Sequence, residues 1–220
     1  MTLLRRLLCT AAALAAVTFA AADTARADVA FLVGNIPQND ENVLLNTGIT
    51  GNPIFGTTNQ TGLAIRFASN ENITAPASGQ ARIEGADGAF TTLTVSVGNA
   101  FPPTGSFTSL ILNLDASITG TVDFVVTETD GTIHNFSNVA VSGSGSNFFT
   151  IVASNGQRIS TVSFTADVPL TFMDAAQFRI GGASPAQQPI PEPTTMLLLG
   201  TGLAGIAAKL RRRRKTHQAD

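Results

Sequence analysis

Apolar residues in the middle of the chain recur at every second position, which is the period of a half-buried strand and not of a helix. Leu93, Val95 and Val97 alternate with hydroxyl residues over 92–97, and Val122, Phe124 and Val126 recur in the same way over 122–127. Residues 110–114 form a continuous apolar run apart from one asparagine, which is typical of a strand buried on both faces. The same reasoning predicts strands at 29–34, 42–46, 62–68, 80–84, 132–141, 147–153, 157–166 and 174–180.

Turn signals separate these segments. Asp87-Gly88, Asp130-Gly131 and Asn155-Gly156 supply residues that adopt the positive backbone angles of tight hairpins. About eleven short strands in about 155 residues predict an all-β fold, and we expect an antiparallel β-sandwich of the jelly-roll-like kind.

The start of the chain has the three parts of a secretory signal peptide. Arg5 and Arg6 precede an apolar run over 7–22, and Ala25-Arg26-Ala27 is a small-x-small cleavage site. Cleavage after Ala27 makes Asp28 the first residue of the mature protein, which the Sec export machinery would deliver across the inner membrane. The alternative is an uncleaved anchor, but sixteen apolar residues are few for a membrane span.

The end of the chain predicts a second membrane segment. Prolines at 189, 191 and 193 break any preceding structure, and the fifteen residues 194–208 carry no charge. Fifteen helical residues are about 22 Å long, so we expect the span to extend to 210, with Lys209 reaching toward the head groups. A stop-transfer cluster follows and should stay in the cytoplasm, formed by Arg211, Arg212, Arg213, Arg214 and Lys215.

A proline motif, a short apolar helix and an arginine cluster in this order resemble the PEP-CTERM sorting signal of Gram-negative bacteria, over about residues 189–215. The resemblance implies that Pro191, Glu192 and Pro193 are recognised by an exosortase, a membrane-embedded transpeptidase that cuts near the motif. It also implies a precursor anchored in the inner membrane with a periplasmic ectodomain, which then moves to the outer surface or an exopolysaccharide matrix. The alternative is an ordinary single-span anchor.

Charge separates the chain into unlike parts. Residues 1–27 carry +2, residues 28–188 carry −8 with four arginines, twelve carboxylates and no lysine, and residues 189–220 carry +4. The acidic middle excludes nucleic acid as a partner and disfavours capture of anionic polymers by charge. The predicted organisation is a signal peptide at 1–27, an ectodomain at 28–182, a Pro-rich linker at 183–193, a transmembrane helix at 194–210 and a basic tail at 211–220.

The middle of the chain is poor in the groups that enzymes use. It holds His134 as its one histidine and no cysteine, so we assign no catalytic residue and interpret His134 as a half-exposed strand residue. We expect no cofactor; carboxylates at two turns, Glu84 with Asp87 and Glu128 with Asp130, are weak candidates for a calcium ion.

The whole sequence has no tryptophan and no tyrosine, the residues from which sugar-stacking platforms are usually built. We therefore interpret the phenylalanines of the middle, Phe124 and Phe164 among them, as core. The leading hypothesis is a non-enzymatic, exported protein of the cell surface or exopolysaccharide. The alternative is a carbohydrate- or protein-binding module, with calcium as a possible requirement.

Overall fold

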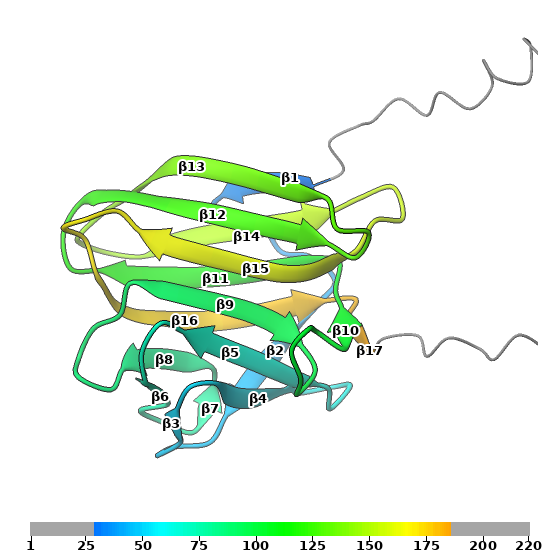
Figure 1. The fold of residues 1–220 in the computed structure, drawn as a ribbon, viewed down its shortest axis with the longest axis horizontal. Coiled ribbons are helices and arrows are strands. Elements are labelled where there is room, and N and C mark those ends of the chain that lie inside the picture. Colours follow the sequence, from blue (N-terminus) through cyan, green and yellow to red (C-terminus); the bar gives the residue numbers. More distant parts are fainter. Residues whose placement is uncertain (1–28, 186–220) are drawn as a thin grey trace, which may run out of the picture.

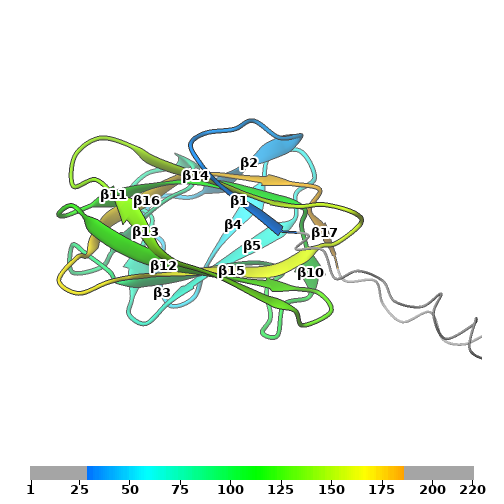
Figure 2. The same ribbon diagram turned by 90° about the horizontal axis from the view of Figure 1, so that it is seen from above.

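A computed structural model describes residues 29–185, which form two antiparallel sheets packed face to face (Figures 1 and 2). The predicted signal peptide, transmembrane helix and basic tail, and residues 191–193 of the sorting motif, lie outside the described residues. Within 29–185 the regular elements are all strands, as the period-two pattern predicts. No helix in this part of the chain is long and apolar enough to span a bilayer.

The two sheets share one strand and have otherwise separate members. In spatial order the first sheet contains β1 (Val29–Val33), β14 (Asn147–Ala153), β11 (Ser109–Ala116), β16 (Phe172–Gly181) and, beside β16, β8 (Arg82–Gly85). The second sheet contains β13 (Ile133–Val141), β12 (Gly120–Glu128), β15 (Ile159–Ala166), β9 (Thr92–Val97), β5 (Ala64–Ser69) and β4 (Ile54–Thr58). The short strands are β3 (Thr50–Gly51), β6 (Ile73–Thr74), β7 (Gly79–Gln80), β10 (Gly105–Ser106) and β17 (Ser184–Pro185).

Strand β2 (Asp40–Leu45) joins the two sheets along one side. Its first half pairs with β16, with Asn42 opposite Arg179, and its second half pairs with β4, with Val43 opposite Thr58. The strand therefore passes from one sheet to the other, and it closes one long side of the sandwich. On the opposite side the edge strands β1 and β13 meet through stacked Phe31 and Phe136 rings, 4.9 Å apart.

Phenylalanine fills the space between the sheets. The ring of Phe124 from the second sheet lies 4.8 Å from Phe31, 5.1 Å from Phe149 and 5.6 Å from Phe164. Eight phenylalanines are fully buried, which confirms the expected core role of Phe124 and Phe164. Two others depart from that expectation, because Phe55 is 39% exposed and Phe101 is 73% exposed.

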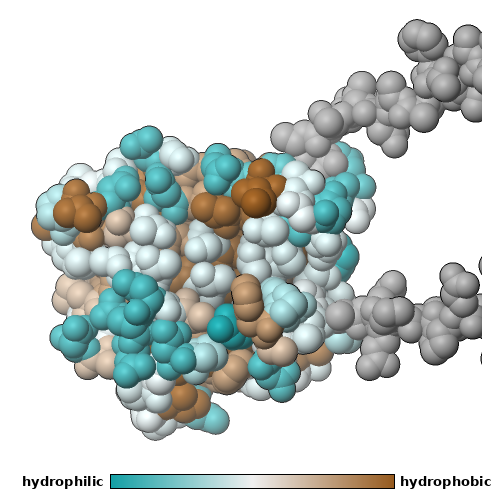
Figure 3. Space-filling view, in the orientation of Figure 1, coloured by the Kyte–Doolittle hydropathy of each residue, from teal (hydrophilic) through white to brown (hydrophobic). Residues whose placement is uncertain are grey.

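The outward positions of the second sheet carry hydroxyl side chains. Thr94 donates to Ser163 across β9 and β15 at 3.2 Å, in the register that the alternation of these strands requires. Figure 3 shows this face as mostly pale, weakly polar surface over β12, β15 and β9, with scattered apolar residues.

One half of the outer face of the first sheet is covered. The segment after β1 crosses it, and Thr150 in β14 donates to Gly34 O at 2.8 Å and accepts from Ile36 N at 3.1 Å. Ile111, on the same outer face, is completely buried, which confirms that the first part of β11 is covered on both sides, while Asn113 and Asp115 further along the strand are not fully covered. The other half, where β11 and β16 reach the far end of the sandwich, carries no such covering segment.

All eleven predicted strands are present, but six short strands were not predicted. The longest of these, β4, points Ile54, Gly56 and Thr58 inward, so only one residue of its buried face is apolar. Gly56 is required there, because a Cβ would lie 2.7 Å from Leu44 O. A sequence pattern that counts apolar residues misses such a strand.

Two of the three predicted hairpin turns are turns of another kind. Asp130-Gly131 closes the hairpin of β12 and β13, as expected. Asn155-Gly156 has positive φ at both residues, yet it joins β14 to β15, which lie in different sheets. Asp87-Gly88 likewise follows β8 in the first sheet before the chain enters β9 in the second. The glycines of all three turns have positive φ, as predicted, but the strands that two of the turns join do not pair with each other.

Candidate functional site

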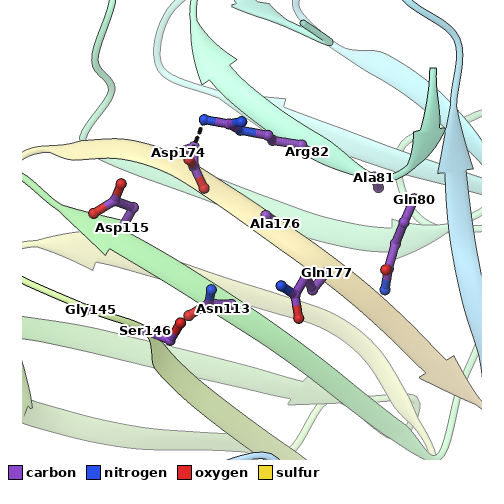
Figure 4. A pocket seen from close by; sticks show the side chains of 10 residues that line it. All are labelled: Gln80, Ala81, Arg82, Asn113, Asp115, Gly145, Ser146, Asp174, Ala176 and Gln177. Atoms are coloured by element: carbon purple, nitrogen blue, oxygen red, sulfur yellow. Dashed lines mark ion pairs between the residues drawn. The ribbon is translucent and has the colours of Figure 1, made fainter. Parts of the chain in front are cut away.

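The uncovered half of the first sheet contains an open groove of about 500 Å³ (Figure 4). Six polar side chains line it: Gln80, Arg82, Asn113, Asp115, Asp174 and Gln177. They come from β7, β8, β11 and β16, and the loop between β13 and β14 adds Ser146 at the rim. Strands distant in sequence thus present their outward positions to one surface.

Two irregularities in β16 flank the groove. The pairing of β16 with β11 shifts between Ile111 and Asn113 and again between Asp115 and Ala116, which is the signature of β-bulges. At the first shift Gln177 adopts φ of 57°, a conformation uncommon outside glycine, and its N–H donates to Ala81 O at 3.0 Å. The bulges therefore bring Asp174 and Gln177 to the same outer face.

An ion-pair cluster occupies one end of the groove. Arg82 Nη2 lies 2.8 Å from Asp174 Oδ2 and 3.0 Å from Glu84 Oε1 (dashed line to Asp174 in Figure 4). Asp174 is 7% exposed and stands directly opposite Asp115 across β11 and β16. Burial raises the pKa of Asp174, the Arg82 charge opposes that rise, and the Asp115 charge adds to it. Like charges facing each other on a sheet are a local cost of folding.

Asn113 carries a second local cost. Its Oδ1 is buried and has no hydrogen-bond partner within residues 29–185. Leaving such a buried acceptor without a hydrogen bond lowers the stability of the fold by about 1–3 kcal/mol. The groove therefore combines a strained backbone, a facing carboxylate pair and an unpaired amide oxygen, and such costs gather at functional sites.

A second concavity lies where the described chain ends. Arg158 donates from Nε to Ser106 Oγ at 2.7 Å and from Nη2 to Ser184 Oγ at 2.7 Å, and it also bonds the carbonyl of Gly182. These bonds hold β17 against β10. Pairing therefore continues to Pro185, three residues into the segment that the sequence assigned to a linker.

The four calcium candidates do not come together as one site. Glu84 pairs with Arg82, and Asp130 caps its own turn by accepting from Thr132 N at 2.8 Å. Asp87 lies beside Glu71, whose pKa is raised by burial and by the Asp87 charge. No group of three His, Cys, Asp or Glu side chains suited to a metal ion is found between residues 29 and 185.

His134 lies on β13, as expected, but it is paired. Its Nε2 is 3.0 Å from Oε1 of Glu128, the fourth calcium candidate, which is 4% exposed. The His134 side chain is itself only 16% exposed, less than the half that we expected. Neither of the two concavities is lined by this pair.

The sequence did not identify the groove. Asn113 and Asp115 interrupt an apolar run at outward positions, and Asp174 is an isolated carboxylate within the mostly apolar strand β16. Those interruptions were the available signal. Their meaning depends on Asp115 meeting Asp174 across the sheet, and residues so far apart in sequence are brought together only by the fold.

Residues 189–214 match the family model of the PEP-CTERM protein-sorting motif. The chain therefore carries a PEP-CTERM sorting motif, as the proline motif, apolar run and arginine cluster predicted. The motif implies that the protein is exported to the cell surface through an anchored precursor and that an exosortase is its processing partner. Comparison with curated proteins found no match.

Among solved structures, a variant of the family 29 carbohydrate-binding module CBM29-2 is similar at a TM-score of 0.28 and 11% identity, over 76% of this chain and 94% of that one. Another structure, described as a carbohydrate-binding module of family 29, gives a TM-score of 0.23 and 14% identity, over 70% of this chain and 86% of that one. TM-scores this low do not mark a shared fold, so what those modules bind says nothing about this chain.

Proposed function

We propose that this is a non-enzymatic surface protein whose ectodomain is displayed at the cell surface or in an exopolysaccharide matrix after exosortase processing. The observation that carries the proposal is the sorting motif at 189–214, which is separated by three residues from the end of the last described strand at Pro185. The residues of the ectodomain support it, because its one histidine is engaged by a buried carboxylate outside both concavities.

We also infer that the ectodomain is a jelly-roll-like scaffold. From β13 to β16, successive strands alternate between the second and first sheets. Such a scaffold leaves its two outer faces free to meet other molecules.

The sorting proposal is tested in the native host by deleting residues 191–215. We expect the deletion variant to be lost from the surface fraction, because the exosortase no longer finds its motif. Glu192→Ala in the full chain should have the same effect, while Asp87→Ala, which removes a carboxylate from the ectodomain, should leave sorting unchanged.

Immunoblotting of cell fractions and intact-mass measurement provide the readout. The parent should be recovered with a mass well below the 22.7 kDa of the complete chain, because both ends are removed. An unchanged location and an unchanged mature mass in the Glu192→Ala variant would contradict the proposal.

A further inference from the structure

We propose that the groove on the first sheet binds a segment of uncharged polysaccharide, a neutral ligand rich in hydroxyl groups. The proposal deepens the proposed function, since display at a polysaccharide-rich surface is where such a ligand is met. It is carried by the groove's own residues, and it can fail while the sorting proposal stands.

The charges of the groove exclude most other ligands. Asp115, Asp174 and the neighbouring Glu84 face a single cation, Arg82, so an acidic polymer would be repelled. The described part of the chain gathers no group of three His, Cys, Asp or Glu side chains that could hold a metal ion. Asp174 and Glu84 are already paired with Arg82, so only Asp115 is left to attract a cation, and the other polar side chains of the groove are neutral.

The hydrogen-bonding groups match hydroxyls. Gln80 and Gln177 line the groove with amides that hold donors and an acceptor, and a sugar hydroxyl is both donor and acceptor. One N–H of Gln80 Nε2 donates to Asn42 Oδ1 at 3.2 Å, and the rest of that amide is left for a ligand. Asn113 Oδ1 is buried without a partner among residues 29–185, and it would meet a ligand hydroxyl only after its side chain turns toward the groove.

Several of these groups are held in place before a ligand arrives. Arg82 is fixed by its two carboxylates, and the backbone that carries the Gln177 side chain is fixed by the bulge and by its N–H bond to Ala81 O. Preorganised groups lose little conformational freedom on binding, and this helps the groove to bind a polar ligand that gains little free energy from each contact.

A protein partner fits this surface poorly. The backbones of β11 and β8 are both paired with β16, so no free strand edge is available for an extended peptide. The only apolar side chains in the lining are Ala81 and Ala176, which cannot act as the large anchors of a protein interface.

The position of the groove suits a displayed protein. In Figure 1, β1 begins and β17 ends at the same end of the sandwich, while the bulged start of β16 lies toward the other end. From Asp174 to Gly181 the strand rises by about 23 Å. The groove therefore stays open to the matrix when the chain is held at its ends.

The test is isothermal titration of the full chain, kept in a detergent without sugar head groups, with neutral β-1,4-linked hexasaccharides of glucose and of mannose. Because the groove has no aromatic platform, we expect dissociation constants on the order of 0.1–1 mM, strengthened by many copies at a surface. The neutral fraction of the host's exopolysaccharide, in a pull-down, is the second probe.

Gln177→Gly is the informative variant. It removes the amide and also relieves the positive φ, so we expect binding to weaken by about tenfold or more while the melting temperature stays equal or rises. Asp174→Asn should likewise weaken binding without lowering stability at pH 7. Gln60→Ala, which truncates an exposed glutamine in the turn between β4 and β5, is the matched control and should bind as the parent does.

Three results would overturn the proposal. The first is no heat or retention with either neutral probe; the second is binding that Gln177→Gly and Asp174→Asn leave unchanged. The third is preference for an oligogalacturonate, a calcium ion or a host protein over the neutral probes. In each case the sorting experiments would be unaffected, and surface location with no glycan binding would identify the failure as that of the groove alone.

Discussion

Phe124→Ala should destabilise the ectodomain by about 3–5 kcal/mol, the range for truncating a fully buried phenylalanine. The ring lies between the sheets and lies within 5.6 Å, between centroids, of Phe31, Phe149 and Phe164. Its removal leaves a cavity among three other phenylalanine rings. Because domains are stable by about 5–15 kcal/mol, the variant should unfold at much lower urea concentration. The measurement is the urea midpoint, followed by circular dichroism.

Phe101→Ala is the matched control. This ring is 73% exposed and makes one cation–π contact, with its centroid 5.5 Å from Arg66 Cζ. The same truncation should cost less than about 1 kcal/mol there. Equal losses at the two positions would mean that the phenylalanine cluster is not what holds the sheets together.

Glu41→Gln should lower stability at pH 7 by roughly 2 kcal/mol, because a charged acceptor is worth more than a neutral one. Glu41 Oε2 accepts from Gln60 N at 2.8 Å and Thr61 N at 2.9 Å, and Oε1 accepts from Thr61 Oγ1 at 2.6 Å. The carboxylate thus fixes the turn between β4 and β5 to β2. The amide of glutamine would place a donor against one of these donors.

The effect should depend on pH. Burial raises the pKa of Glu41, but the hydrogen bonds from Thr61 and Gln60 outweigh burial and lower the pKa below the ordinary value of 4.5. A carboxyl whose pKa is lower in the folded state stabilises that state above its unfolded pKa, and the contribution is lost as pH falls through the folded value. The difference between parent and variant should therefore be full at pH 7 and shrink below about pH 4.5.

Glu71→Gln should have the opposite effect on the stability of the fold at pH 7. The pKa of Glu71 is raised by burial and by Asp87, so its ionised form at pH 7 does not stabilise the fold. Its substitution should leave the melting temperature unchanged or raise it. Thermal melts of both variants from pH 3 to pH 7 give the comparison, and a Glu41→Gln deficit that stays constant over that range would refute the assigned role.

The fold could be predicted from the sequence where the buried positions of a strand are occupied by apolar side chains. Leu93, Val95 and Val97 mark β9 directly, because each inward position is apolar. The signal fails where an inward position must be small or polar, as at Gly56 and Thr58 of β4. It also fails for pairing, since nothing in Asn155-Gly156 shows that the two strands it joins belong to different sheets.

The candidate site was less predictable than the fold. Turns collect carboxylates whatever their role, so reasoning from turns selected Asp87 and Asp130, and neither lines the groove. Asp174 and Gln177 reach the groove through bulges, which change the face of a residue without changing its sequence neighbours. The sorting motif was predictable because its parts are contiguous and need no fold to meet.

The bonds of Arg158 to Ser106, Gly182 and Ser184 have a consequence for processing. With β17 held to β10 as far as Pro185, six residue steps lead to Pro191, and six steps span at most about 20 Å. An enzyme that recognises Pro191 would therefore bind it within that distance of the folded ectodomain. The fold thus limits the distance between the ectodomain and an enzyme bound at the motif. The end of the sandwich that holds Arg158 would lie close to that enzyme.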